Sequence, residues 1–165
     1  MAQQCELAVG VEVIDLEAVR FRNMGEPSSG VLFWTNTYAM GGGPLYVSLW
    51  VYDRDIKRFR NILPAGMYVR ALGTHKFFPS LQNKSVLIVA GPSRLVDFNA
   101  PLDDPDRETI WSPHYYILDI YRYHPNLGFT KIGSYETKKK YDPEEDHNTL
   151  IDSELPRIRA LLRKQ

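Results

Sequence analysis

The sequence has little of several features that mark particular protein classes. It contains a single cysteine, Cys5, which excludes a disulfide framework within the chain and a cysteine-based zinc finger. Twenty basic and twenty acidic residues leave no net charge, so the overall basic signature of a duplex-DNA-binding protein is missing. No apolar run approaches the roughly 18 residues of a membrane span, and the N-terminus has no signal-peptide pattern. We therefore expect an intracellular protein.

Catalytic motifs are also missing. There is no glycine-rich phosphate loop, nucleophile elbow or zinc pattern, and the four histidines lack metal-ligand spacing. Asp53 and Asp55, together with Asp103, Asp104 and Asp106, could imitate the calcium loops of a β-sandwich, but the first pair precedes an expected helix. We therefore expect no enzymatic activity, no metal and no cofactor.

The strand predicted at residues 45–53 (LYVSLWVYD) organises the rest of the chain. Its odd-numbered positions are aliphatic, whereas its even-numbered positions hold Tyr46, Ser48, Trp50 and Tyr52. Because successive side chains of a strand alternate between faces, one face suits a core and the other presents three aromatic rings. Such a face predicts a ligand or a covering element.

The remaining pattern predicts further strands and one short helix. Residues 17–30 are expected as a polar connection and residues 73–84 as a loose stretch, and SVLIVA at 85–90 is typical of a strand buried on both faces. Apolar residues at helical spacing predict a short helix at 54–63 after the organising strand. The other expected strands are residues 7–14, 31–36 and 67–72.

The order of these elements favours an OB-fold, a five-stranded Greek-key barrel with a helix between its third and fourth strands. Other small β barrels share much of this order. Beyond it, we expect a hairpin of strands 115–123 and 129–135 and an amphipathic C-terminal helix with Ser153 near its start and Ile151, Leu155, Ile158 and Leu162 along one face. The sequence thus predicts an all-β single domain over residues 1–165, with a core at about 5–92 and an extension at 93–165.

A family resemblance covers residues 5–91, about half of the chain. The block GPLYVSLWVYDRDIKRFRNILPAGMYVRALGTHKF resembles the second OB-fold of the telomere end-binding, or protection-of-telomeres, proteins. The shared pattern is a strand ending in WVYD, a short aromatic-containing helix and a strand led by glycine, and VLFWTN resembles the preceding strand. The resemblance implies binding of single-stranded G-rich telomeric DNA, protection of chromosome ends in nuclear telomeric chromatin, and no catalysis. Other proteins of the telomere complex would be further partners.

Single-stranded binders stack bases on exposed aromatic rings along a locally basic groove, at roughly 1–3 kcal/mol per base. This chemistry agrees with the ring-bearing face of residues 45–53 and with basic residues in the loops around it. The expected nucleic-acid-binding residues are Arg22, Phe33, Thr35, Trp50, Tyr52, Arg54, Lys57, Arg70, His75, Lys76 and Phe77.

Other interpretations remain open from the sequence. Trp50 and Tyr52 could pack under the C-terminal helix or the extra hairpin, and a one-residue register slip would turn Phe33 into the core. OB-folds also serve as protein-interaction modules, in which case a protein partner would cover the aromatic face. A barrel holding a small apolar ligand is less favoured, because barrels of this size are filled by side chains.

Overall fold

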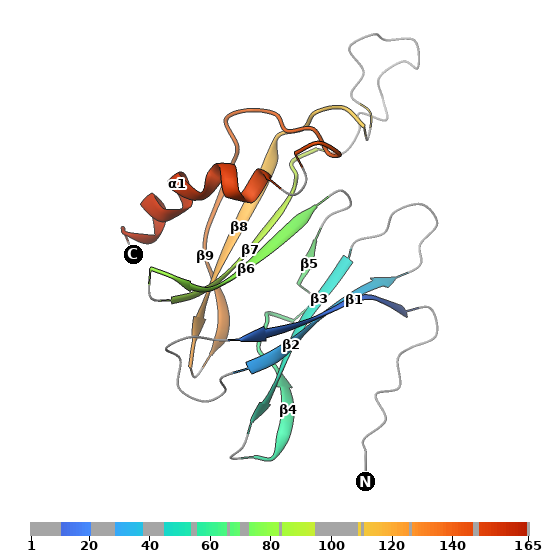
Figure 1. The fold of residues 1–165 in the computed structure, drawn as a ribbon, viewed down its shortest axis with the longest axis vertical. Helices are drawn as coiled ribbons and strands as arrows, with labels where there is room; N and C mark the ends of the chain where they lie inside the picture. The colour runs from blue at the N-terminus through green and yellow to red at the C-terminus, as the bar shows by residue number, and fades with distance from the viewer. Residues whose placement is uncertain are drawn as a thin grey trace.

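The structure of the protein is a computed structural model that describes residues 11–20, 29–37, 45–53, 56–65, 67–69, 73–82, 84–94, 109, 111–125, 127–146 and 149–164. Side chains in residues 11–20, 29–37, 45–47 and 68–69 lie outside the described part. The described elements are strands β1 (Val11–Arg20), β2 (Ser29–Thr37), β3 (Leu45–Asp53), β4 (Arg58–Asn61), β5 (Tyr68–Val69), β6 (Thr74–Leu81), β7 (Lys84–Pro92), β8 (Tyr116–His124), β9 (Gly128–Glu136) and helix α1 (Leu150–Leu162) (Figure 1). The expected mostly β architecture with one C-terminal helix is confirmed.

The strands form two antiparallel sheets. The first sheet has the order β1-β2-β3-β4, with β5 paired to the other end of β3, and the second has the order β6-β7-β8-β9. Apart from the β3–β5 pair, neighbouring strands in both sheets are consecutive in sequence, as expected for hairpin-connected strands. Within the described residues the strands do not close into a barrel.

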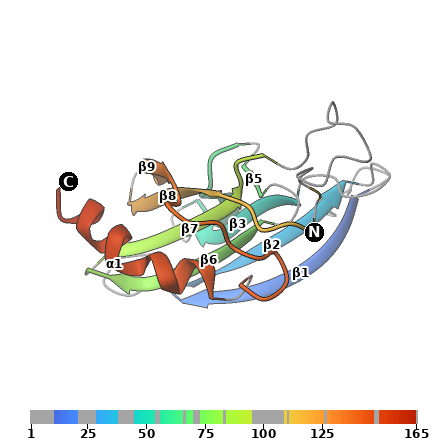
Figure 2. The ribbon, with the colours of Figure 1, turned by 90° about the horizontal axis from the view of Figure 1, so that it is seen from above.

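The second sheet is covered on both faces. One face packs on the first sheet through a cluster made of Leu49, Val51, Ile62, Leu63, Met67, Leu87, Val89, Tyr123 and Phe129. The opposite face packs under α1 through a cluster made of Leu81, Val86, Ile88, Ala90, Tyr116, Leu118, Ile120, Tyr141, Leu150, Ile151, Ile158 and Leu162. Strand β7 supplies alternate residues to both clusters, which confirms the prediction that residues 85–90 are buried on both faces. Figures 1 and 2 show α1 lying across the second sheet.

Helix α1 confirms the predicted amphipathic segment but begins earlier than expected. Ile151, Ile158 and Leu162 are buried, as their helical spacing predicts. The placement of Ser153 at the helix start is wrong, because the helix begins at Leu150 and contains Pro156. The N–H groups of Thr149 and Leu150 both donate to the Asp146 carbonyl, at 2.9 and 2.8 Å, and so start the helix ahead of Ser153.

The predicted helix at residues 54–63 is wrong. Arg58–Asn61 instead form strand β4, which folds back on β3 with Asp53 opposite Arg58 and Trp50 opposite Asn61. Pairing with β3 satisfies the backbone of this segment, and a helix of ten residues has little stability of its own. Ile62 and Leu63, which the helix prediction placed on a buried face, do enter the core, but from the end of β4.

Two segments expected to be irregular are strands. Residues 74–81 form β6. The sequence did not predict this strand because its apolar residues do not share one face: Phe77 contacts the first core cluster, whereas Phe78 contacts the second. Pro79 is compatible with this strand because β6 is at the edge of its sheet in the described residues. Residues 17–20, expected within a polar connection, belong to β1.

The C-terminal third is part of the second sheet. Strand β8 pairs with β7 along seven residue positions, from Val86 opposite Arg122 to Pro92 opposite Tyr116, and β9 pairs with β8, which confirms the predicted hairpin. The predicted division into a core at about 5–92 and an extension at 93–165 stays a prediction.

Candidate nucleic-acid interface

Strand β3 separates a core face from a ring-bearing face. Leu49 and Val51 are fully buried, whereas Trp50 is 36% exposed and Tyr52 is 44% exposed. This alternation is the one predicted from the sequence of the strand. The interpretation in which α1 covers Trp50 and Tyr52 is not supported, because α1 packs on the far face of the second sheet.

Strand β4 adds a third exposed ring beside Tyr52. Phe59 lies directly opposite Tyr52, is 62% exposed and meets it edge to face, with ring centroids 5.3 Å apart. Side chains directly opposite in an antiparallel pair share one face of the sheet, so Trp50, Tyr52 and Phe59 form one surface. We name these three side chains the hairpin aromatic face. Ile56, 58% exposed, lies in the turn that joins the two strands.

Sequence reasoning missed Phe59 because it assigned this residue to the buried side of a helix. Arg58–Asn61 contain only one apolar residue, so no apolar period in the sequence marks this segment as a strand. Lys57, in the turn, has a backbone in the left-handed region, with φ 52°. No turn motif in the sequence predicts this conformation.

Side-chain bonds on the hairpin fix the end of β4. The Oδ1 atom of Asn61 accepts hydrogen bonds from the backbone N–H groups of Leu49, at 3.1 Å, and Leu63, at 3.0 Å. The Ile62 N–H donates to the Leu49 carbonyl at 2.9 Å. These bonds turn the chain after β4 toward the core and leave the rings on the outer face.

The hairpin has a local excess of positive charge. Between Asp53 and Asn61 the sequence holds four basic and two acidic residues, a local net charge of +2 in a chain with no net charge. Lys57 and Arg58 are exposed at the turn. Arg60 is engaged within the protein, because its Nε lies 3.1 Å from Oδ2 of Asp53. Among the described basic residues of the hairpin, Lys57 and Arg58 are therefore the ones available to an anionic ligand.

The structure brings together three of the predicted binding residues, namely Trp50, Tyr52 and Lys57, on the β3–β4 hairpin. Phe33 and Thr35 lie on the neighbouring strand, opposite Ser48 and Tyr46 respectively, although their side chains are outside the described part. Arg22, Arg54 and Arg70 lie outside the described residues.

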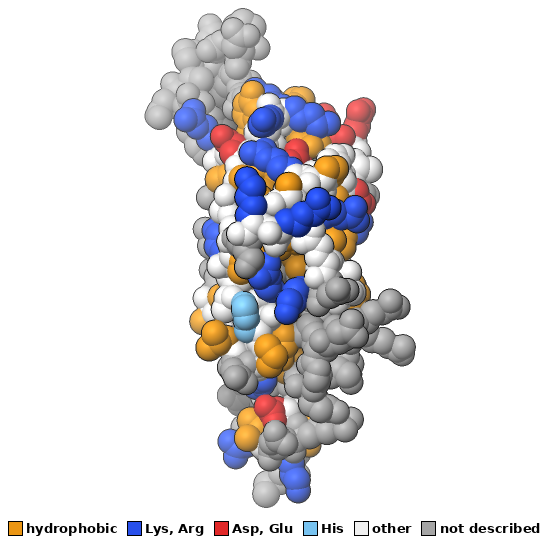
Figure 3. All heavy atoms as spheres, turned by 90° about the vertical axis from the view of Figure 1, so that its left-hand side faces the viewer, with side chains coloured by type: hydrophobic (Ala, Val, Ile, Leu, Met, Phe, Trp, Pro, Cys, Tyr) orange, Lys and Arg blue, Asp and Glu red, His pale blue; other side chains and the backbone are white. Residues whose placement is uncertain are grey.

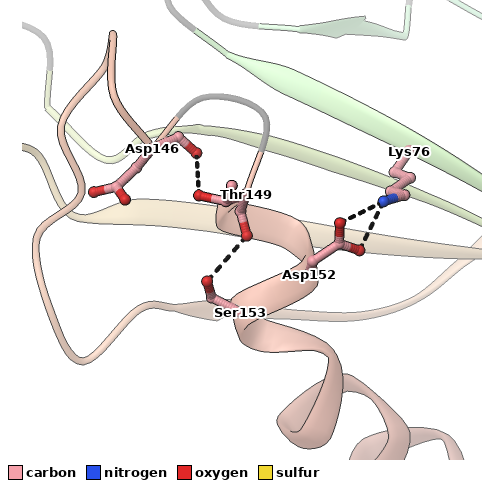
Figure 4. A network of polar contacts seen from close by, with 5 residues as sticks. All are labelled: Lys76, Asp146, Thr149, Asp152 and Ser153. Atoms are coloured by element: carbon pink, nitrogen blue, oxygen red, sulfur yellow. Dashed lines mark hydrogen bonds and ion pairs between the residues drawn. The ribbon is translucent and has the colours of Figure 1, made fainter.

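The other three predicted binding residues lie on β6, in the second sheet. Lys76 pairs with Asp152 of α1, with its Nζ 2.6 Å from Oδ2, as Figure 4 shows. Phe77 packs against the first core cluster, with its ring 6.2 Å from that of Phe129. His75 is half-buried opposite Val89. The structure does not bring these residues to the hairpin aromatic face.

The described part of the chain contains neither a cluster of metal-ligating side chains nor a long apolar helix. No group of three or more histidine, cysteine or acidic residues there could hold a metal ion. Of the calcium-loop candidates, Asp55, Asp103, Asp104 and Asp106 lie outside the described residues. No described helix is both long and apolar enough to span a membrane.

Comparisons with models of protein families, with curated proteins and with solved structures found no match to this chain.

Proposed function

We propose that this protein binds single-stranded nucleic acid through the hairpin aromatic face, with bases on Trp50, Tyr52 and Phe59 and phosphates near Lys57 and Arg58. The observation that carries the proposal is the set of three exposed rings on one face of the β3–β4 hairpin, with Leu49 and Val51 of β3 buried on the opposite face.

The arrangement suits stacking in two respects. Flat rings accept any base, and each base stacked on an aromatic ring contributes roughly 1–3 kcal/mol to binding. Tyr52 and Phe59 are held edge to face, so little side-chain freedom is lost when a base binds on either ring. A surface of this kind binds without a high net charge, which fits a chain whose basic and acidic residues are equal in number.

The finer form of the proposal is single-stranded G-rich telomeric DNA, bound in the nucleus at chromosome ends, and it rests on the resemblance of residues 5–91 to the second OB-fold of telomere end-binding proteins. An OB-type barrel belongs to the same finer form. The consecutive pairing of β1, β2 and β3 supports it. It also requires closure between the two sheets, which the described residues do not make.

A second candidate function is a protein-interaction module, and one observation favours it. Strand β4 is at the edge of the first sheet in the described residues, and Ile56 and Phe59 are exposed beside it. An edge strand can accept a strand from a partner, with exposed apolar side chains supplying the contact area.

Fluorescence anisotropy with labelled oligonucleotides tests the proposal. We expect saturable binding of a single-stranded G-rich telomeric repeat, weaker binding of the complementary C-rich strand, and a loss of affinity as salt rises from about 50 to 200 mM. Absence of binding to both strands at about 50 mM salt would reject the nucleic-acid proposal and favour the interaction module. Equal binding of both strands would retain the proposal and remove its telomeric form.

A further inference from the structure

The second half of α1 and the residues that follow it are strongly basic. From Leu155 to the last residue, the sequence holds Arg157, Arg159, Arg163 and Lys164 and no acidic residue. Arg159, Arg163 and Lys164 are exposed, and their side chains make no hydrogen bond or ion pair within the described part of the chain. Three cations are therefore presented to solvent without a counter-charge among the described residues.

The acidic residues of α1 are engaged elsewhere. Asp152 pairs with Lys76, and the two carboxylate oxygens of Glu154 accept hydrogen bonds from the hydroxyl groups of Tyr135, at 3.0 Å, and Tyr141, at 2.7 Å. Both carboxylates belong to the first half of the helix and point to internal partners. They do not offset the charge of the second half.

Two neighbouring elements extend the basic surface. The Gln82 side chain donates a hydrogen bond to the carbonyl of Arg159 at 3.1 Å, which places the β6–β7 turn, with the exposed Lys84, against the helix. Arg157 stacks over the Tyr135 ring at 4.0 Å and donates to the Glu136 carbonyl, so its position is fixed while its charge remains. Figure 3 shows Lys and Arg side chains gathered on the face of the molecule that carries α1.

We infer that this surface, formed by Lys84, Arg157, Arg159, Arg163 and Lys164 and named here the α1 cation surface, binds the phosphate backbone of a single-stranded nucleic acid. The inference rests on the proposed function. It adds a second contact, in which cationic side chains bind backbone phosphates and do not distinguish the bases. A cation in the last turn of a helix is stabilised by the helix dipole, but that effect does not explain Lys84 on a separate element.

The chemistry of the surface favours phosphate over the alternatives. Arg159 and Arg163 are four residues apart and so lie one above the other on the helix, about 6 Å apart along its axis. Their guanidinium groups match phosphate oxygens in a two-point geometry. No large hydrophobic side chain of α1 is exposed, whereas a helix that binds lipid inserts apolar side chains into the membrane. The same absence of rings leaves base stacking to the hairpin.

The test compares two variants of the full chain that each lose three positive charges. In the first, Arg159, Arg163 and Lys164 are replaced by Gln. The matched control replaces the exposed Lys138, Lys139 and Lys140 by Gln, which removes the same charge from another surface. Gln is nearly as good a helix former as Arg and Lys, so we expect the helix to remain folded. Binding of the G-rich and C-rich strands is measured by anisotropy from about 50 to 200 mM salt, and folding by circular dichroism.

We expect the α1 variant to bind both strands more weakly, and by the same factor. The plot of log K against log salt should also become less steep, its slope shrinking in magnitude by about 2, at about 0.7 for each lost phosphate contact. An equal effect of the lysine control, or no effect of the α1 variant while the wild type binds, would overturn the inference and leave the proposed function intact. If replacing Tyr52 and Phe59 by Ala leaves binding unchanged while the α1 variant loses it, the hairpin aromatic face is not the binding site, and the α1 cation surface stands as a nucleic-acid contact. Binding to phosphatidylserine vesicles without binding to either strand would overturn both.

Discussion

The ring of Phe59 meets the ring of Tyr52 edge to face, 5.3 Å away, on the outer surface of the β3–β4 hairpin. Each ring supports the orientation of the other, because the positive edge of one aromatic ring is attracted to the negative face of the next. Both rings are exposed, and the strand beneath them is anchored by Leu49 and Val51. Function and stability can therefore be separated at this hairpin.

The first prediction concerns these two rings. Replacing Tyr52 or Phe59 by Ala should lower affinity for the single-stranded G-rich oligonucleotide by about 1–3 kcal/mol, because each change removes a stacking surface. Stability should change by less than about 0.5–1 kcal/mol, since the side chains are exposed. Anisotropy titration and urea unfolding measure the two quantities on the same samples.

A matched control lies on another surface. Trp111 is 61% exposed in a turn of the described chain, outside the hairpin, so Trp111→Ala removes an equally accessible ring. We expect its effect on affinity to be small. A loss as large as that of Tyr52→Ala would show that the hairpin is not the preferred stacking site.

The sequence predicted β3 and α1 because each has one buried and one open side. The period of two in LYVSLWVYD and the helical spacing of Ile151, Ile158 and Leu162 mark which side of each element is buried. Strand β7 was predictable for the opposite reason, since both of its faces are covered and its apolar run is continuous.

The rest depended on contacts that local patterns do not contain. Strand β4 forms because it pairs with β3. Its one aromatic residue, Phe59, is exposed, whereas the predicted helix would have buried it. Strand β6 divides Phe77 and Phe78 between two cores, so its pattern resembles no simple period. The ion pair that removes Lys76 from the candidate interface joins residues 76 positions apart in sequence.

The second prediction concerns the attachment of α1. Glu154 accepts hydrogen bonds from Tyr135 and Tyr141, so Glu154→Ala should leave two partly buried hydroxyl groups without this acceptor. We expect a loss of about 2–4 kcal/mol in the free energy of unfolding, since a hydrogen bond to a charged group contributes about 1.5–3 kcal/mol. Asp152→Ala, two residues earlier, removes only an exposed ion pair and should cost about 0–1 kcal/mol. Equal losses in urea unfolding would contradict the assigned role of Glu154.

The third prediction concerns alkaline pH. Burial, followed by the negative charges of Asp142 and Asp146, raises the pKa of Tyr116 from 10.0 to about 12. Burial also raises the pKa of Tyr135 and of Tyr141, both of which hydrogen-bond to Glu154. Above about pH 10 the unfolded chain releases these protons while the folded protein retains them, so unfolding is favoured as pH rises.

The resulting stabilisation should be complete below about pH 10 and should be lost between about pH 10 and 12. Urea midpoints measured from pH 8 to 11.5 should fall in the wild type and fall less steeply in Tyr116→Phe. The same pH dependence in both proteins would show that the Tyr116 hydroxyl does not contribute.

The last prediction concerns the contact between the two sheets at Gly128. The N–H of Phe129 donates to the carbonyl of Ile62 at 2.7 Å, and this bond joins the start of β9 to the segment that follows β4. Gly128 has a φ of +75°, and a Cβ atom there would overlap the carbonyl oxygen of Ile62. Gly128→Ala should therefore destabilise the protein by about 2 kcal/mol or more, from the left-handed backbone and the overlap together.

Gly133 provides the matched control on the same strand. A Cβ atom at Gly133 would meet no atom within 4 Å, so Gly133→Ala should be close to neutral. Thermal unfolding of both variants makes the comparison. If Gly128→Ala unfolds at the wild-type temperature, the close approach of β9 to Ile62 does not hold the sheets together. In that case the apolar residues of the first core cluster, among them Leu49 and Val51, hold the two sheets together without the hydrogen bond between Phe129 and Ile62.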